Sequence, residues 1–262
     1  MSLDAARTKK EPSEVDLALA RSLIYQCLAL ALQPPTEEMV SSFATTAGDL
    51  SAAAALLDSE SGSNLTPAAA ILRGNALSVE ALSPSYHRLF GHTARGSVPP
   101  YETEYGAEAL FQQPYEISDL MAFYRAFGLR FNVPERERPD HVSCECEFLS
   151  FLALKEAYAL SREENSMLEE TRKANRLFLR DHLGRFVPAF AQRLMREDPQ
   201  GFYGALGNLS TRFVAGECAR LGVPEGSQNL ALRSADDDRI PMACGETGQC
   251  PIGSRTGADE ET

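Results

Sequence analysis

The sequence predicts an all-α protein: a single compact bundle of about eight to ten helices. Apolar residues recur at the i, i+3, i+4, i+7 spacing of one helix face along most of the chain. Neither sustained alternation of β-branched residues nor an Asn-Gly or Asp-Gly hairpin turn occurs in the sequence. Prolines and capping residues also separate the periodic segments, as expected for helices joined by short connections.

The first two helices are predicted from their caps. Ser13 is placed to cap a helix whose apolar stripe runs to Ala31, and Pro34-Pro35 ends it. Thr36 caps a second helix. The stretch from there to Asn64 is rich in Ala, Ser and Gly, so its structure is only weakly specified.

Proline again marks the next elements. Thr66-Pro67 and Ser83-Pro84 each predict a helix with proline in its first position, and Gly91 is placed to end the short helix Ser85–Phe90. A loop from His92 to Gly106 follows. The remaining helices are predicted at Ser118–Leu129, Asp140–Arg162, Leu168–Leu183, Val187–Arg196 and Phe202–Leu221.

The distribution of charge divides the chain into three parts. The 262 residues hold 37 acidic and 25 basic side chains, a net charge of −12. Residues 235–262 carry seven acidic and two basic residues, few apolar ones and much Gly, Ser and Thr. We therefore expect an acidic flexible tail there, a flexible N-terminus at 1–13 and one helical domain at 14–234.

Composition excludes several classes of protein. The negative charge argues against nucleic acid or an anionic membrane surface as the main partner. The chain has neither an apolar run long enough to span a bilayer nor the apolar core of a secretion signal at its N-terminus. Six cysteines are too dilute for a disulfide scaffold. These features predict a cytoplasmic protein.

Motifs for catalysis, nucleotide binding and metal binding are missing. The sequence has no GxGxxG, GxxxxGK[ST], GxSxG, HExxH or CxxC. Cys144 and Cys146, two apart on a helix, point away from each other. Cys244 and Cys250 in the tail are expected to be ordinary thiols, with a zinc site or a disulfide as the alternative. We therefore expect no metal, no cofactor and no catalytic residues.

The segment that opens the long helix is the most informative. Asp140 stands where an N-cap is needed. His141 and Glu145 fall on the same stripe as Phe148 and Leu152, which otherwise looks like core. One interpretation is a helix cap with a satisfied His141–Glu145 pair. The other is a partly buried polar pocket at a helix N-terminus, suited to a peptide or an anion.

A second informative segment covers residues 84–106. Tyr86, Leu89 and Phe90 form an apolar cluster, and the loop behind them contains Pro100, Tyr101 and Glu102. Such a loop commonly packs its aromatic residues into the core and leaves its charges in water. A surface of Pro and Tyr bordered by carboxylates would also suit a basic peptide.

These segments together resemble the TorD/DmsD/NarJ-like chaperones, which assist the maturation of redox enzymes. The similarity covers residues 15–222 and rests on Tyr-His-Arg-Leu-Phe-Gly at 86–91, Pro-Tyr-Glu at 100–102, and Glu-Arg-Pro-Asp-His at 137–141 with the Glu-x-Glu-Phe that follows. The subgroup that serves dimethyl sulfide, ethylbenzene, chlorate or selenate enzymes is the most similar. The chain departs from many relatives in having Phe186 where they have Trp, and its acidic tail has no counterpart.

The resemblance implies a TorD-like helical chaperone of the cytoplasm rather than an enzyme. Such proteins bind the unfinished catalytic subunit of a molybdenum oxidoreductase until its cofactor is inserted, and many also hold its twin-arginine signal peptide. The client-binding surface that it implies consists of Tyr86, Leu89, Phe90, Pro100, Tyr101, Glu102, Pro139, Asp140, His141 and Glu145. We expect Asp140, His141 and Glu145 to form the polar end of a groove and Tyr86, Phe90 and Tyr101 its apolar wall.

Two other functions remain open at this point. A helical hydrolase or nucleotide-binding protein would use His141 with Asp140 or Glu145. A structural subunit would stay with the finished oxidoreductase. The sequence names neither the client nor the oligomeric state.

Overall fold

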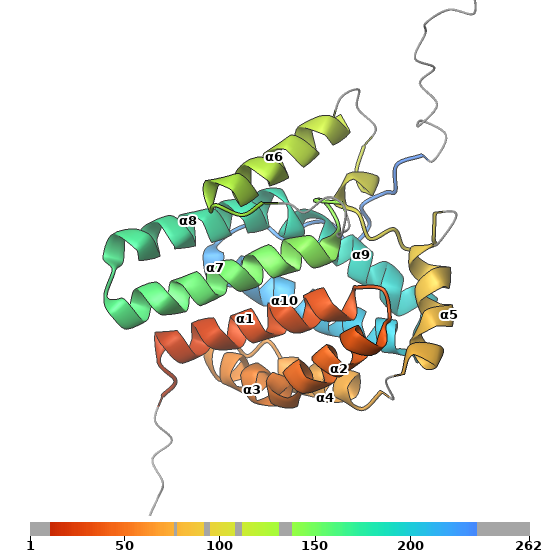
Figure 1. Cartoon of the computed structure of the whole chain (residues 1–262), viewed down its shortest axis with the longest axis horizontal. Helices are drawn as coiled ribbons and strands as arrows, with labels where there is room; N and C mark the ends of the chain where they lie inside the picture. Colours follow the sequence, from red (N-terminus) through yellow and green to blue (C-terminus); the bar gives the residue numbers. More distant parts are fainter. Residues whose placement is uncertain (1–10, 76–77, 92–94, 108–111, 131–137, 235–262) are drawn as a thin grey trace, which may run out of the picture.

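The computed structural model describes residues 11–75, 78–91, 95–107, 112–130 and 138–234, and its helices form a bundle (Figure 1). Within these ranges, β-pairing is limited to isolated bridges, which confirms the predicted all-α fold. The α-helices are α1 (Glu14–Ala31), α2 (Glu37–Thr46), α3 (Leu50–Ser61), α4 (Leu65–Arg73), α5 (Val79–Phe90), α6 (Gln112–Ala126), α7 (Val142–Arg162), α8 (Asn165–Asp181), α9 (Leu183–Glu197) and α10 (Phe202–Leu221). Two short 3-10 helices are η1 (Ala47–Asp49) and η2 (Glu102–Glu104).

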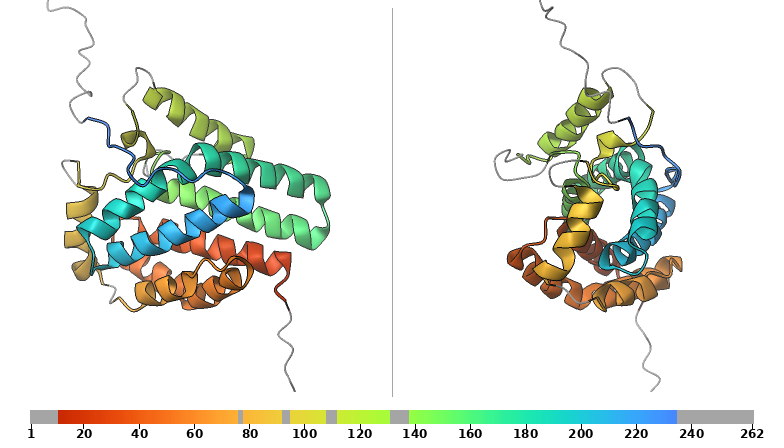
Figure 2. Two further views of the ribbon diagram at one scale, coloured as in Figure 1. Left: turned by 180° about the vertical axis from the view of Figure 1, so that it is seen from behind. Right: turned by 90° about the vertical axis from the view of Figure 1, so that its right-hand side faces the viewer.

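The antiparallel pair α1 and α7 forms the centre of the bundle (Figure 1). Its small buried residues let the two helices approach closely, and the hydroxyl groups of Ser22 and Ser150 lie 2.9 Å apart between them. α3 packs on α1 and α8 on α7, while α10 packs on α9 and α4. Figure 2 shows α6 along the outer edge of the bundle, beside α7 and α8, rather than inside it.

Several predicted helix ends are confirmed by their caps. Ser13 and Asp16 form a reciprocal capping box at the start of α1, and the Thr36 hydroxyl accepts a hydrogen bond from the amide of Met39 in α2. α5 ends at Gly91, whose φ of 90° is accessible to glycine. These ends could be predicted because each depends on residues close together in the sequence.

Other helix boundaries differ from the prediction. Residues 50–61 form α3, although their composition specifies it weakly; the buried Leu50, Ala54 and Leu57 stabilise it by packing. Pro84 lies inside α5, which begins after the cap Ser78, so Ser85–Phe90 is only its second half.

Three further starts lie away from the predicted positions. α4 begins at Leu65, with Pro67 in its third position, because the carboxylate of Asp58 accepts hydrogen bonds from the amides of Leu65 and Thr66. α6 begins at Gln112 instead of Ser118, and α9 at Leu183, with Pro188 inside its first turns.

No described helix is both long and apolar enough to cross a membrane. The predicted tail at 235–262, with Cys244 and Cys250, lies outside the described residues, as does most of the predicted N-terminal segment. Before the tail, residues 231–233 return to η2: the amide of Arg233 donates to the carbonyl oxygen of Glu104, and that of Gly106 to the carbonyl oxygen of Ala231.

Candidate functional site

The two informative sequence segments meet at one place in the structure. The amide of Glu102 donates to the carbonyl oxygen of Asp140, and that of Val142 to the carbonyl oxygen of Pro100, each at 2.8 Å. Tyr101 and His141 form the isolated antiparallel bridge between these bonds. The backbone thus joins the loop before α6 to the start of α7 and gathers the polar residues of both.

Asp140 is fully buried and accepts hydrogen bonds from its surroundings. Its carboxylate receives the hydroxyl of Thr103 at 2.7 Å and two guanidinium nitrogens of Arg138 at 3.0 and 2.9 Å. The same guanidinium lies over the Tyr101 ring, 4.5 Å from its centroid. Asp140 was predicted to cap the long helix, but the structure uses its carboxylate to hold the loop at Thr103 instead.

His141 is the N-cap of α7. Its Nδ1 accepts a hydrogen bond from the amide of Ser143 and lies 2.7 Å from the Ser143 hydroxyl. Burial, with the positive charge of Arg138, lowers the pKa of His141 to about 3, so the ring is neutral near pH 7. The predicted His141–Glu145 pair is wrong because the capping position directs the ring toward the first-turn amides.

Glu145 is the least satisfied side chain of the site. It is fully buried, and neither of its carboxyl oxygens has a hydrogen-bond partner among the described residues. Burial raises the pKa of Glu145 well above its usual value, and the charges of Glu102 and Asp140 raise it further. The protonated acid is therefore favoured, and it can donate its proton to the neighbouring Glu102 carboxylate.

Glu102 stands at the centre of a buried ionic network that the sequence did not predict. Its carboxylate receives Nδ1 of His182 at 3.0 Å and the guanidinium of Arg185 at 2.6 Å. From α6, Asp119 meets the other ring nitrogen of His182 at 3.1 Å, and Glu116 meets Arg185 at 3.3 Å. Since both nitrogens of His182 face carboxylates, that ring is suited to carry a proton.

The network is completed from the end of the described chain. The guanidinium of Arg233 donates to both carboxylate oxygens of Glu116 and to the carbonyl oxygen of Thr103. Burial lowers the pKa of His182, but its bonds to Glu102 and the charge of Asp119 outweigh this and raise it overall. The charged side chains of four segments that are far apart in the sequence therefore neutralise one another in the interior.

Tyr86 and Phe90 of the predicted apolar wall lie in a separate ring cluster, whereas Tyr101, its third residue, lies at the candidate site. Tyr86 packs on Phe90 at 4.8 Å between ring centroids, and Phe90 packs on Tyr203 of α10 at 5.2 Å and on Phe190 of α9 at 6.2 Å. Leu89 is also fully buried. These contacts hold α5 on α9 and α10, which is the role of core residues.

The open groove predicted at this site is not present in the described conformation. Leu89, Pro100, Glu102, Asp140, His141 and Glu145 are all buried, and Tyr86 and Phe90 nearly so. Tyr101 and Pro139 are half-buried, and Arg138 beside them is exposed. Of the predicted surface, only Tyr101 and Pro139 are partly accessible; Tyr86, Leu89 and Phe90 are core residues, and the remaining residues are buried where the loop pairs with the start of α7.

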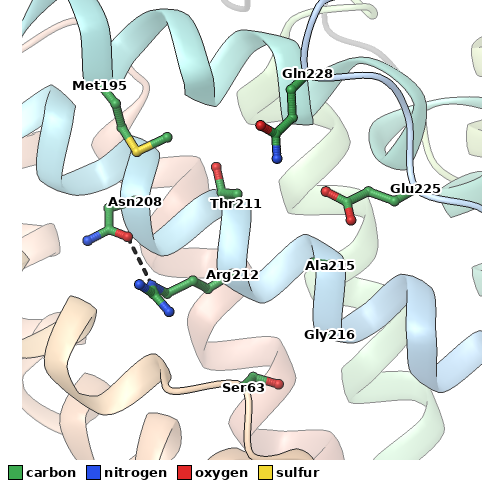
Figure 3. Close-up of a pocket in the computed structure, with 9 residues that line it drawn as sticks. All are labelled: Ser63, Met195, Asn208, Thr211, Arg212, Ala215, Gly216, Glu225 and Gln228. Atoms are coloured by element: carbon green, nitrogen blue, oxygen red, sulfur yellow. Dashed lines mark hydrogen bonds between the residues drawn. The ribbon is translucent and has the colours of Figure 1, made fainter.

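A separate concavity lies along α10. It has a volume of about 510 Å³ and is lined by Ser63, Met195, Asn208, Thr211, Arg212, Ala215, Gly216, Glu225 and Gln228 (Figure 3). Nε of Arg212 donates to Asn208 at 3.0 Å, which fixes the side chain against the helix. The Thr211 hydroxyl is shielded and has no partner within the described parts of the chain. None of the predicted site residues lines this concavity.

Among the residues that the structure describes, no group of three or more His, Cys, Asp and Glu side chains is arranged to hold a metal ion. Cys27, Cys146 and Cys218 are buried free thiols, and burial raises the pKa of Cys27 to about 12.

Comparison with known proteins identifies similar chains. The sequence model of the family described as nitrate reductase delta subunit matches residues 38–192, which include the candidate site except Arg233. The chlorate reductase assembly chaperone protein of Ideonella dechloratans is 35% identical over 163 residues, 59% of this chain and 78% of that protein.

Two further relatives match shorter stretches. The selenate reductase assembly chaperone protein of Thauera selenatis is 34% identical over 106 residues, 40% of this chain and 53% of that protein. The chaperone protein TorD of Photobacterium profundum is 27% identical over 140 residues, 53% of this chain and 63% of that protein. The match thus spans less than two thirds of these two relatives.

Proposed function

Because the chain belongs to the nitrate reductase delta subunit family, we propose that it is an assembly chaperone for the catalytic subunit of a molybdenum oxidoreductase. It binds this client before cofactor insertion and releases it afterwards. The observation that carries the proposal is the family match, which covers the candidate site, together with relatives named as chaperones of chlorate and selenate reductases. The proposal places this work in the cytoplasm, where the client is made.

The proposed client-binding region is the candidate site. Its accessible edge is formed by Tyr101, Pro139 and the exposed Arg138. The Arg138 guanidinium lies over the ring of Tyr101, and the His141 imidazole meets that ring edge to face at 5.3 Å between centroids, so the ring is held in place. The buried side chains of Asp140 and Glu102 stabilise this edge, because their hydrogen bonds to Thr103 and Arg185 fix the backbone on both sides of it.

We include the twin-arginine signal peptide of the client in the proposal. The net charge of −12 favours the approach of a basic segment over any acidic one at long range. Once close, a guanidinium of the peptide can stack on Tyr101 by replacing Arg138, whose own guanidinium lies over that ring. Binding of this peptide should therefore weaken as salt is added.

The proposal also states that the chain is not an enzyme. A hydrolase would need an accessible base, but the imidazole of His141 is about 1% exposed, and its pKa of about 3 makes it a poor base. Purified protein should turn over neither nucleoside triphosphates nor esters. Hydrolysis that is lost in a His141→Gln variant would favour the enzyme instead.

The deciding experiment is a pull-down from cells blocked in molybdopterin synthesis. A chaperone should accumulate on the catalytic subunit that lacks its cofactor, and it should leave that subunit when synthesis is restored. A structural subunit would instead co-purify with the finished, cofactor-loaded complex. Failure to retain any oxidoreductase subunit in the blocked cells would contradict the proposal.

A further inference from the structure

Helix α6 covers the buried part of the candidate site. Its Glu116 and Asp119 reach down to Arg185, Arg233 and His182. One turn later, the Tyr124 hydroxyl donates to the carbonyl oxygen of Pro139 at 2.9 Å. Side chains of α6 therefore occupy Arg185, Arg233 and His182 on this side of the network.

Beyond the charged end, α6 lies on an aromatic surface. This α6-facing surface consists of Phe148 and Phe151 of α7, Phe178 and His182 of α8 and its end, and Arg185 and Arg233 of the network. Phe123 meets Phe178 at 5.3 Å between ring centroids, and Phe127 meets Phe148 at 5.7 Å. Phe148 and Phe178 are buried beneath these contacts, while Phe123 and Phe127 on the covering side stay half-buried.

α6 is attached less deeply than the helices at the centre of the bundle. Of its 15 residues, only Glu116, Leu120 and Tyr124 are buried, whereas α7 buries 12 of 21. The side chain of Asp119, which holds His182, is 42% exposed. Helices with few buried residues open at lower free energy than the core does, so α6 is a segment that can leave without unfolding the bundle.

The charges left behind define what can take its place. When α6 leaves, Arg185 and Arg233 lose Glu116, and His182 loses Asp119. The α6-facing surface then holds two guanidinium groups and an imidazole with fewer carboxylates around them. An occupant must supply negative charge there and aromatic rings one to two turns further on. A basic, arginine-bearing segment does not meet this requirement.

We propose that the α6-facing surface is a docking site for an acidic, aromatic-bearing helix of the client, and that α6 fills this site in the free protein as a stand-in for that helix. The inference rests on the proposed chaperone function and adds to it the chemistry of the bound segment. It assigns this surface to the body of the client, whereas the signal peptide meets the edge at Tyr101.

The first test uses a fluorescent peptide with the sequence of residues 112–129 and the full-length protein. In the wild type, α6 competes from within the chain, so the peptide should bind weakly. The double variant Asp119→Asn/Tyr124→Phe loosens α6 and should bind the peptide about tenfold more tightly, since the cost of opening is lowered. Glu169→Gln, an exposed site on α8 with the same charge change, should behave as the wild type. Equal binding to all three proteins would overturn the inference.

The second test uses the client subunit identified by the pull-down. Adding it should displace the peptide and accelerate hydrogen exchange of the α6 amides while α1 and α7 stay protected. A peptide carrying Glu116→Gln and Asp119→Asn should bind about tenfold more weakly than the unaltered one. Co-elution of the client with no change in peptide binding or α6 exchange would overturn the inference and leave the chaperone function intact. Absence of co-elution would overturn both.

Discussion

The buried carboxyl group of Glu145 should make the stability of the chain depend on pH, and one substitution should remove that dependence. Burial, Glu102 and Asp140 raise the pKa of Glu145 well above its usual value in the folded protein. In the unfolded chain, the same group has an ordinary pKa of about 4.3. Between the two values, the folded protein therefore keeps a proton that the unfolded chain has released.

The direction in which stability changes with pH follows from this difference between the folded and unfolded pKa. The contribution of protonated Glu145 to stability is fully present below about pH 4.3 and is lost as pH rises toward the folded pKa. The loss amounts to about 1.4 kcal/mol for each pH unit in that window. In Glu145→Gln, nothing titrates at this position, and the neutral amide replaces the protonated acid at similar volume. The unfolding free energy of the variant minus that of the wild type should therefore rise with pH by the same slope.

Urea unfolding followed by far-ultraviolet circular dichroism, from about pH 5 to about pH 8, measures this difference directly. Titrating groups that do not interact with Glu145 act equally on both proteins and cancel in this difference. Glu169→Gln on the exposed face of α8 is the control and should give a difference that does not change with pH. If Glu145→Gln gives the same flat difference, Glu145 is ionised in the folded protein, and our description of the site is wrong.

Three further outcomes are expected. Asp140→Asn should lower the unfolding free energy by about 1–3 kcal/mol and weaken client binding, and His141→Gln should also weaken client binding. Calorimetry measures the stability and the client affinity of each variant. An unchanged client affinity would assign these residues to the fold alone. Truncation after Ser234 should shift the thermal midpoint by less than about 4 °C, and a larger fall would show that the tail contributes to the fold. Truncation after Leu230 should lower the midpoint further, because Glu116 then loses both hydrogen bonds from Arg233 and keeps Arg185. Purified protein should contain no stoichiometric metal by elemental analysis, and one zinc per chain that is lost in Cys244→Ser/Cys250→Ser would contradict this.

Features that depend on neighbouring residues could be predicted from the sequence. The caps Ser13 and Thr36 and the end at Gly91 lie within a few residues of the groups they satisfy. The helix of residues 50–61 could not be predicted, since its stability comes from packing rather than from a capping or periodic signal. The start of α4 was also missed, because its cap is the side chain of Asp58, seven residues earlier.

The candidate site was predicted in part for the same reason. The sequence placed His141 and Glu145 on an apolar stripe and pointed to Glu102, and all three lie together in the structure. The partners of Glu102 were missed because His182 and Arg185 are 80 and 83 residues away along the chain. The signal that could have found His182 is its position between Phe178 and Phe186, where a polar residue among core rings requires a buried partner.

The late position of Arg233 in the sequence determines when its ion pair with Glu116 can form during synthesis. Synthesis runs from the N-terminus, so Glu102, Glu116 and His182 all leave the ribosome before the guanidinium that neutralises Glu116. Until Arg233 is made, the buried carboxylate of Glu116 lacks the two hydrogen bonds from this guanidinium, and α6 has one contact fewer with the rest of the chain. The ionic network of the chaperone is therefore completed late in its own translation, when Arg233, the last of its members in the sequence, is added.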